Sequence, residues 1–157
     1  MFSLRLAQDD DLELLFQWAN DPLVRQMAFH SEPISLSDHK NWFYFRLNAL
    51  ETKIFILEEN KIPIGQIRFD LDKTKSFYYI DYSIDEKYRG KGIGKKILIL
   101  GIEFHKPFNN GRLFYRAFVK KNNQTSIKCF INVGFTFCSE DSDCMIFELS
   151  NEVDWNQ

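Results

Sequence analysis

Apolar residues recur along this chain with two different periods, and each period predicts a different kind of element. Short segments rich in aromatic and β-branched residues, bounded by turn-forming residues, predict strands. These strands cover residues 2–6, 53–57, 62–69, 77–84, 113–119, 135–138 and 145–149. Apolar residues three and four positions apart predict helices between them. The helices cover residues 9–22, a segment that Ser37 caps, residues 94–106 and residues 123–133.

The ends of these elements carry signals of their own. Pro107 is expected to end the third helix, because proline has no backbone N–H to donate. Asn123 and Gly134 are expected to cap the fourth helix. Residues 23–34 fit neither period and are expected to be irregular. The order β-α-α-β-β-β-α-β-α-β-β indicates an α/β fold with mixed strand directions, in one domain over residues 1–157.

A glycine-rich stretch joins the 77–84 strand to the helix that follows it. Gly90, Gly92 and Gly94 lie within five residues, so the backbone can turn tightly and come close to a ligand. Where such a turn opens a helix, free N–H groups and the positive end of the helix dipole bind phosphate. The basic residues around the turn are Lys87, Arg89, Lys91, Lys95 and Lys96. The stretch is therefore predicted to bind an anion.

The spacing of the glycines excludes two common phosphate-binding motifs. A dinucleotide fingerprint requires a third glycine where this chain has Lys95, and the P-loop requires a Lys-Ser/Thr pair that is absent. The remaining pattern, Arg-x-x-Gly-x-Gly from Arg89, resembles the loop with which GNAT N-acetyltransferases hold the pyrophosphate of acetyl-CoA. Downstream, residues 123–135 resemble the closing motif of that family, Asn-x-x-Ser/Ala-Ile-x-x-Tyr/Phe-x-x-x-Gly-Phe.

This resemblance covers residues 2–149 and implies a mostly antiparallel central sheet flanked by helices, with acetyl-CoA as donor and no metal. It implies that the backbone of Ile84 contacts the pantetheine arm. Residues 89–95 should bind the pyrophosphate mainly through N–H groups, with the backbone of Arg89 used before its guanidinium. The implied cofactor residues are Ile84, Arg89, Gly90, Lys91, Gly92, Ile93, Gly94, Lys95, Asn123, Ser126 and Phe130.

Acetyl transfer to an amine also has to remove a proton from the attacking nitrogen. Asp81 is the only carboxylate inside the 77–84 strand, where partial desolvation would make it a better base. The alternative is that Asp81 pairs with a neighbouring basic group and only positions the strand. Water can also accept the proton, so Asp81 is predicted as the candidate base while a dedicated base is not obligatory.

Phe130 departs from the family pattern, in which many members have a tyrosine whose phenol protonates the leaving thiolate. Phenylalanine has no proton to give, so an active enzyme needs another donor. The alternatives are the proton of the attacking ammonium, a water molecule, or a nearby hydroxyl such as that of Tyr115 or Ser126. A catalytically silent acyl-CoA-binding module is therefore a second hypothesis for this chain.

The first 50 residues are expected to recognise the accepting amine. Their pattern resembles GNAT members that acetylate sugar nucleotides, including pseudaminic-acid-pathway enzymes, and less closely Rim-type and aminoglycoside acetyltransferases. The predicted acceptor-binding residues are Trp18, Asn20, His39 and Trp42. A core role is the alternative for both tryptophans. The predicted acceptor is a small primary amine, an amino sugar or nucleotide-linked amino sugar, with protein N-termini, aminoglycosides or polyamines as alternatives.

Composition limits the partners further. A net charge of −2 and the gathering of basic residues at one loop argue against general nucleic-acid binding. Three cysteines without a CxxC pair indicate neither a zinc site nor a disulfide framework. No apolar stretch approaches the ~20 residues that span a bilayer. We therefore expect a cytoplasmic protein that acts on a small molecule and binds neither nucleic acid nor membrane, with a homodimer left open.

Overall fold

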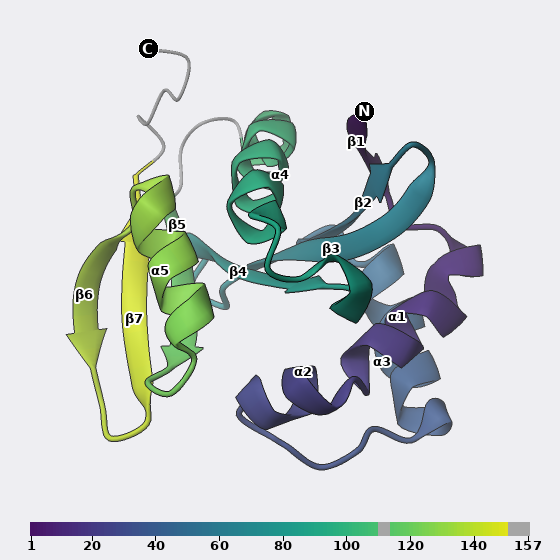
Figure 1. Cartoon of the computed structure of the whole chain (residues 1–157), viewed down its shortest axis with the longest axis horizontal. Helices are drawn as coiled ribbons and strands as arrows, with labels where there is room; N and C mark the ends of the chain where they lie inside the picture. The colour runs from purple at the N-terminus through teal and green to yellow at the C-terminus, as the bar shows by residue number, and fades with distance from the viewer. Residues whose placement is uncertain (110–113, 151–157) are drawn as a thin grey trace.

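The computed structural model describes residues 1–109 and 114–150, and the strands among these residues form a seven-stranded sheet (Figure 1). The strands are β1 (Phe2–Leu6), β2 (Thr52–Glu59), β3 (Ile62–Leu71), β4 (Phe77–Ile84), β5 (Phe114–Lys120), β6 (Thr136–Glu140) and β7 (Cys144–Leu149). They lie in the order β1-β2-β3-β4-β5-β7-β6. Neighbouring strands are antiparallel except for β4 and β5, which are parallel. The predicted mixed and mostly antiparallel sheet is confirmed.

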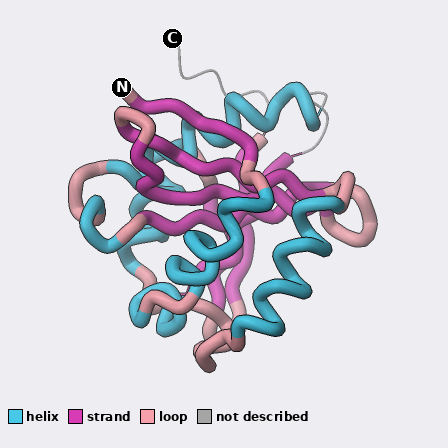
Figure 2. Tube along the Cα trace, turned by 90° about the vertical axis from the view of Figure 1, so that its right-hand side faces the viewer, coloured by secondary structure: helices cyan, strands magenta, loops and turns pink. Residues whose placement is uncertain are grey.

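Helices cover both faces of this sheet. They are α1 (Leu12–Ala19), α2 (Pro22–Met27), α3 (Leu36–Asn48), α4 (Ile93–Asn109) and α5 (Gln124–Val133), with 3-10 turns η1 (Asp9–Asp11) and η2 (Glu86–Tyr88). α4 lies on one side of the strands and α1, α2 and α3 lie on the other (Figure 1). Figure 2 shows the same arrangement from the side, with helices around the twisted strands.

Strand β2 shows how the sequence builds a core on each face, because successive side chains of a strand point to opposite sides. Ile54 and Ile56 pack with Phe43 of α3 in the cluster under α1 and α3. Phe55 and Leu57 pack in the larger cluster under α4 and α5. Each of these side chains is buried, and burying one contributes about 1.5–3 kcal/mol.

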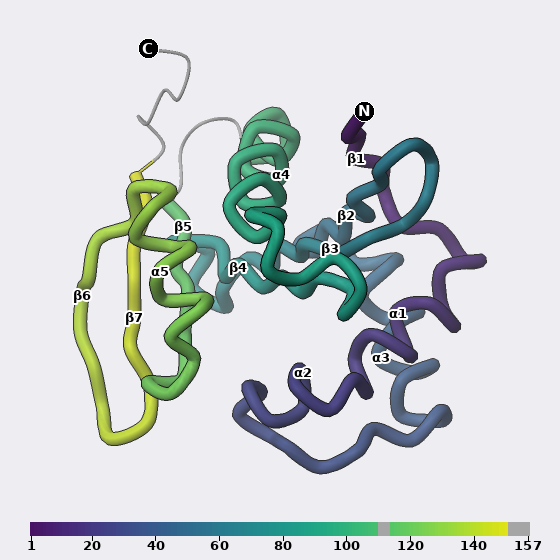
Figure 3. The backbone as a smooth tube through the Cα atoms, in the orientation of Figure 1, coloured from purple at the N-terminus to yellow at the C-terminus, as the bar shows by residue number. Residues whose placement is uncertain are grey.

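Strands β4 and β5 are paired only at their beginnings. Their register runs from Phe77 opposite Phe114 to Tyr79 opposite Arg116, although both strands continue for several residues beyond this point. The two strands therefore diverge and divide the sheet. Figure 3 shows β1–β4 on one side of this division and β5, β7 and β6 on the other.

The divergence leaves backbone groups of β4 without a strand partner. In antiparallel pairing, alternate residues exchange hydrogen bonds with the neighbouring strand. Backbone hydrogen bonds at Phe77 and Asp85 show that the odd-numbered residues of β4 bond toward β3. The N–H and C=O groups of Ile80, Tyr82 and Ile84 consequently point into the gap between β4 and β5.

The prediction that residues 23–34 are irregular throughout was wrong, because α2 begins at Pro22. The carboxylate of Asp21 accepts hydrogen bonds from the N–H groups of Leu23 and Val24, at 3.0 and 3.1 Å. Proline suits the first position of a helix, where its missing N–H costs nothing. An Asp-Pro pair is thus the local signal for this helix.

Other boundaries also differ from those predicted. α3 is capped by Ser35 instead of Ser37, since the Ser35 hydroxyl accepts from the Asp38 N–H at 3.1 Å. Pro107 lies inside α4, and the helix ends two residues later. A proline in the last turn removes only one hydrogen bond, so the helix continues past it. The predicted start of the 113–119 strand at Leu113 lies outside the described residues.

Candidate functional site

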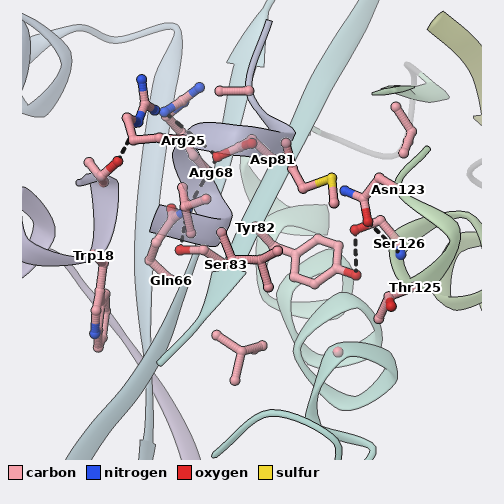
Figure 4. Close-up of a pocket in the computed structure, with 18 of the residues that line it drawn as sticks. Trp18, Arg25, Gln66, Arg68, Asp81, Tyr82, Ser83, Asn123, Thr125 and Ser126 are labelled. Atoms are coloured by element: carbon pink, nitrogen blue, oxygen red, sulfur yellow. Dashed lines mark hydrogen bonds and ion pairs between the residues drawn. The ribbon is translucent and has the colours of Figure 1, made fainter. Parts of the chain in front are cut away.

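A cavity of about 930 Å³ opens where β4 and β5 diverge. Residues 80–84 of β4 and residues 118–120 of β5 line it from the two halves of the sheet. The glycine-rich turn and the start of α5 also line it, as do residues of α1, α2 and α3. Figure 4 shows Trp18 and Arg25 on one side of the strands and Asn123 and Ser126 on the other. The gap in the sheet is therefore the entrance to a site that both faces of the fold help to build.

The glycine-rich turn has the backbone conformation that its sequence predicts. Gly90 and Gly92 adopt φ angles of +73° and +75°, in the left-handed region that favours glycine. A Cβ atom at either position would meet no atom within 4 Å, so the space beside the turn is open. Among the described residues, the N–H groups of Gly90, Lys91 and Gly92 find no acceptor. Together with the first N–H groups of α4, they form an anion-binding surface.

The guanidinium of Arg89 is directed away from this surface. Its Nε donates to the carbonyl oxygen of Ile84 at 3.0 Å, and its Nη2 lies 2.9 Å from Oδ1 of Asp21. Burial of Asp21 opposes its ionisation, but hydrogen bonds from Arg89 and from the backbone of α2 outweigh it and lower the pKa of the carboxyl. Arg89 therefore joins the glycine turn to α2, and the Ile84 carbonyl that faces the gap is already occupied.

The lysines of the turn differ in where they point. Lys91 donates to the carbonyl of Lys87 at 3.0 Å, and Lys96 lies over the ring of Phe2. Lys95 is exposed at the start of α4. Of the predicted cofactor residues, neither Lys91 nor Lys95 lines the cavity, whereas the others do. The turn thus presents backbone N–H groups to the cavity, and its lysines stand around the rim.

The start of α5 forms the opposite wall of the cavity. Asn123 caps the helix, with its side-chain oxygen accepting from the Ser126 N–H at 3.2 Å. The hydroxyl of Ser126 lies 3.2 Å from that of Tyr82. Phe130 is only 3% exposed and packs edge-on against Tyr82 and Phe135. All three predicted residues of α5 thus line the cavity.

Asp81 lines the cavity on the side of α1–α3, but it is not desolvated as expected. Its side chain is 56% exposed. It accepts a hydrogen bond from Gln66 at 3.2 Å and lies 3.9 Å from Arg68. The expectation of a desolvated carboxylate is therefore wrong, and the alternative of a basic neighbour has a residue, Arg68, to support it.

Two of the predicted acceptor residues have structural roles. Both amide atoms of Asn20 bond the backbone of Ile34, at 2.8 and 2.9 Å, and Asn20 does not line the cavity. Trp18 is 7% exposed in the core under α1 and α3. Its indole Nε1 donates to Asp85, which caps η2, at 3.0 Å. Asn20 is consequently excluded as a contact to an acceptor. Trp18 can contact an acceptor only through the edge of its indole ring.

The other two predicted acceptor residues lie at the cavity. His39 is buried and its Nε2 donates to the carbonyl of Leu12 at 3.0 Å, which leaves Nδ1 with the lone pair. Burial outweighs this hydrogen bond and lowers the pKa of His39, so the ring is neutral at physiological pH. Trp42 is partly exposed, and the guanidinium of Arg68 stacks over it, 5.1 Å from the ring centroid.

Tyr82, Arg25 and Arg68 also line the cavity, although they were not predicted from the sequence. Alternation along the 77–84 strand could have revealed Tyr82, because it predicts that even-numbered side chains share one face. By contrast, Tyr115 was considered as a proton donor and is fully buried outside the cavity, where it bonds His105 at 3.0 Å.

Residues 1–109 and 114–150 contain no group of three or more His, Cys, Asp or Glu side chains placed to hold a metal ion. Among the same residues, no helix is both long and apolar enough to cross a membrane.

Comparison with known proteins agrees with this geometry. A family model described as an acetyltransferase (GNAT) domain matches residues 2–136. An uncharacterised protein of Methanocaldococcus jannaschii is 31% identical over 84% of this chain, which spans only 27% of that protein's length. The acetyltransferase PseH of Campylobacter jejuni is 26% identical over 85% of this chain and 82% of its own.

A solved structure supports the fold independently. Spermidine N-acetyltransferase from Vibrio cholerae, in complex with CoA and spermine, superposes with a TM-score of 0.82 over 94% of both chains, at 16% identity. At that identity the likeness concerns the fold alone. The family model, by contrast, covers most of the chain and includes the glycine turn and α5. The chain therefore belongs to the GNAT family of N-acetyltransferases.

Proposed function

We propose that this chain transfers the acetyl group of acetyl-CoA to the primary amine of a small, negatively charged acceptor, an amino sugar linked to a nucleotide. The free N–H groups of the glycine turn support the placement of the pyrophosphate there. The backbone groups of Tyr82 and the N–H of Ile84 face the gap without a strand partner, which supports the placement of the pantetheine arm there, where it can complete the hydrogen bonding of β4.

The acceptor then enters from the side of α1–α3. Odd-numbered residues of β4 face this side, so Asp81 and Ser83 lie where the amine would approach the thioester. Asp81 can hold the ammonium and accept its proton, while the exposure of its side chain also lets water take the proton. Holding the amine beside an activated thioester supplies most of the catalysis, because it replaces a bimolecular encounter.

The observation that supports a negatively charged acceptor is a pair of basic side chains that form no ion pair with a carboxylate of the described residues. Arg25 of α2 donates only to the carbonyls of Ala19 and His30, at 2.6 and 2.9 Å. Lys120 of β5 donates only to the carbonyl of Gln26, at 3.3 Å. Both side chains line the cavity, and no carboxylate of the described residues lies within 4.0 Å of either.

These cations favour an acceptor with a phosphate or carboxylate over a polyamine. Asp38 of α3 also lines the cavity, but its one negative charge is outnumbered by the positive charges of Arg25 and Lys120. The charge of Asp81 is balanced by Arg68, which lies 3.9 Å away. Guanidinium groups bind phosphates through paired hydrogen bonds. The partly exposed Trp42 adds a ring against which a sugar or base can stack.

A substrate panel tests this proposal. Acetyl-CoA and the purified chain would be assayed with an aminodeoxy sugar nucleotide, the free amino sugar, spermidine and an N-terminal peptide. We expect kcat/KM to be highest for the sugar nucleotide. Arg25→Gln should raise its KM about tenfold, the effect of one lost charged hydrogen bond, and leave the KM of the free sugar unchanged. Lys40→Gln, which alters an exposed cation of α3, is the matched control.

Two other results would contradict the proposal. A higher kcat/KM for spermidine or for the peptide would show that the cations do not select the acceptor. Tight binding of acetyl-CoA by calorimetry without turnover of any amine would favour the silent acyl-CoA-binding module. Cytoplasmic location and a homodimer stay predictions of the sequence.

A further inference from the structure

A tyrosine side chain crosses the gap between the two halves of the sheet. Tyr82 belongs to β4, and its backbone groups face the gap. Its side chain extends to α5, where its hydroxyl lies 3.2 Å from Oγ of Ser126 (Figure 4). Because α5 packs against β5, the ring reaches from one half of the sheet to the other. Any molecule that occupies the gap therefore lies against this ring.

The hydroxyl of Tyr82 is held from several sides. Phe130 packs edge-on against its ring, with the centroids 5.6 Å apart. A Cβ atom added to Gly94 would lie 3.4 Å from the hydroxyl and 2.9 Å from Sγ of Cys129, so the start of α4 also lies close to the hydroxyl. Burial and the neighbouring Cys129 raise the pKa of Tyr82. The phenol consequently keeps its proton at neutral pH.

This position matches a need of the reaction. Aminolysis of a thioester expels a thiolate, which requires a hydrogen-bond donor and finally a proton. Ser126 lies in the first turn of α5, where the helix dipole favours a negative charge. Tyr82 and Ser126 thus place two hydroxyl groups and a helix N-terminus on one wall of the cavity.

We propose that Tyr82 is the proton donor to the CoA sulfur, with Ser126 as the residue that positions its hydroxyl. This inference rests on the proposed acetyl transfer and adds a catalytic residue to it. The amine nitrogen bonds to the acetyl carbon, the carbon–sulfur bond breaks, and the phenolic proton moves to sulfur to give free CoA thiol. The proton lost by the acylated nitrogen goes to Asp81 or water. The phenolate regains a proton from solvent through Ser126.

The other candidate donors fit the structure less well. Phe130 has no proton to give, and Tyr115 is buried outside the cavity with His105 and Asn109 as its partners. The Ser126 hydroxyl is a far weaker acid than a phenol, so it serves better as a relay. Tyr82 is thus the phenol of the described residues that both borders the gap and approaches the start of α5.

The test compares Tyr82→Phe with the wild type. We expect kcat to fall by about 10²-fold, within the range of general acid catalysis, with the KM of acetyl-CoA nearly unchanged. With the selenoester analogue of acetyl-CoA, whose selenolate leaves without protonation, the loss should shrink to about threefold or less. Adding Phe130→Tyr to Tyr82→Phe should restore part of the rate, since it returns a phenol to the same wall. Tyr79→Phe, on an exposed part of the same strand, is the matched control.

Equal thioester rates for Tyr82→Phe and the wild type would overturn this proposal and leave the proposed function intact. A loss of the same size with the selenoester would also overturn it, because Tyr82 would then only shape the cavity. Ser126→Ala provides a second variant if Tyr82→Phe fails to fold, and it should show the same sensitivity to the leaving group. A wild-type chain that acetylates no amine would instead refute the proposed function.

Discussion

The guanidinium of Arg89 lies 2.9 Å from the carboxylate of Asp21, which caps the helix that carries Arg25. A residue of the predicted phosphate-binding turn thus holds the helix that we assign to the acceptor. The side chains of both partners are mostly buried, so the ion pair is screened less than a surface pair. Cofactor and acceptor sites are therefore mechanically connected through one contact.

The first prediction concerns this ion pair. Asp21→Asn keeps a helix cap but removes the charge, and it changes no residue of the glycine turn. We expect the KM of the acceptor to rise about three- to tenfold, as for the loss of ~1 kcal/mol, while the KM of acetyl-CoA changes less than about twofold. Steady-state kinetics with each substrate varied would measure both. An unchanged acceptor KM would show that the ion pair does not position α2.

The second prediction concerns the glycine turn. Gly92→Val places a branched side chain in the open space beside free N–H groups, at a φ of +75°. Losing two or more charged hydrogen bonds to phosphate should weaken CoA binding by about 10²-fold or more in calorimetry. Gly134→Val imposes similar backbone strain at φ +112°, at a residue that does not line the cavity, and serves as control. Normal CoA affinity in folded Gly92→Val would place the phosphates elsewhere.

The third prediction concerns Phe130→Tyr in an otherwise unchanged chain. Because Tyr82 already offers a phenol at this wall, kcat should change by less than about tenfold, or ~1.4 kcal/mol of barrier. Phe130 is buried against two aromatic rings, so a new hydroxyl without a partner should cost about 1–3 kcal/mol of stability. Measuring kcat and Tm on one preparation separates the two effects. A large rate gain with unchanged Tm would contradict the role given to Tyr82.

The fourth prediction concerns pH and His105 in the core under α4. Its Nδ1 bonds the Tyr115 hydroxyl at 3.0 Å, its Nε2 is buried without a partner, and it stacks on Phe69. Burial, with the nearby charge of Lys53, lowers the pKa of His105 to about 3. In the unfolded chain the imidazole of His105 therefore takes up a proton near pH ~6.5. In the folded chain it stays neutral at this pH.

His105 therefore makes the free energy of unfolding depend on pH. Above pH ~6.5 it has no effect, and at lower pH it decreases the free energy of unfolding by up to about 1.4 kcal/mol per pH unit. Urea unfolding of the wild type and His105→Phe between pH ~7 and ~5 would measure the difference in slope. The variant should show a shallower decline. The exposed His30→Gln variant should keep the wild-type slope, and identical slopes for all three would refute the prediction.

Turns, helix caps and single strands could be predicted from the sequence, because each depends on a few residues that are adjacent in the chain. Glycine conformation at Gly90 and Gly92 and the cap at Asn123 depend on a few adjacent residues. The individual strands could be predicted for the same reason, while the mostly antiparallel sheet that they form was implied by the resemblance. The resemblance then supplied the cofactor side of the site, because its motifs lie on these local elements.

The acceptor side could not be predicted in the same way. Asn20 is satisfied by the backbone of Ile34, and Trp18 by Asp85, which lies 67 residues away in the chain. A polar residue beside an aromatic one has the same pattern whether it contacts a ligand or another segment. Asp81 likewise appeared shielded because it lies in a strand, but that strand stands beside a gap and leaves the carboxylate in water.

The short pairing of β4 with β5 has a mechanical consequence. Among the described residues, three opposed pairs join the two halves of the sheet, so these rows act as a hinge between two stiffer plates. A change in the angle between the two plates breaks few hydrogen bonds within either plate. This motion therefore requires little free energy. The Tyr82–Ser126 contact and the Lys120–Gln26 contact bridge the plates on either side. Admission and release of a long, thin cofactor would then need only a small rotation at the hinge.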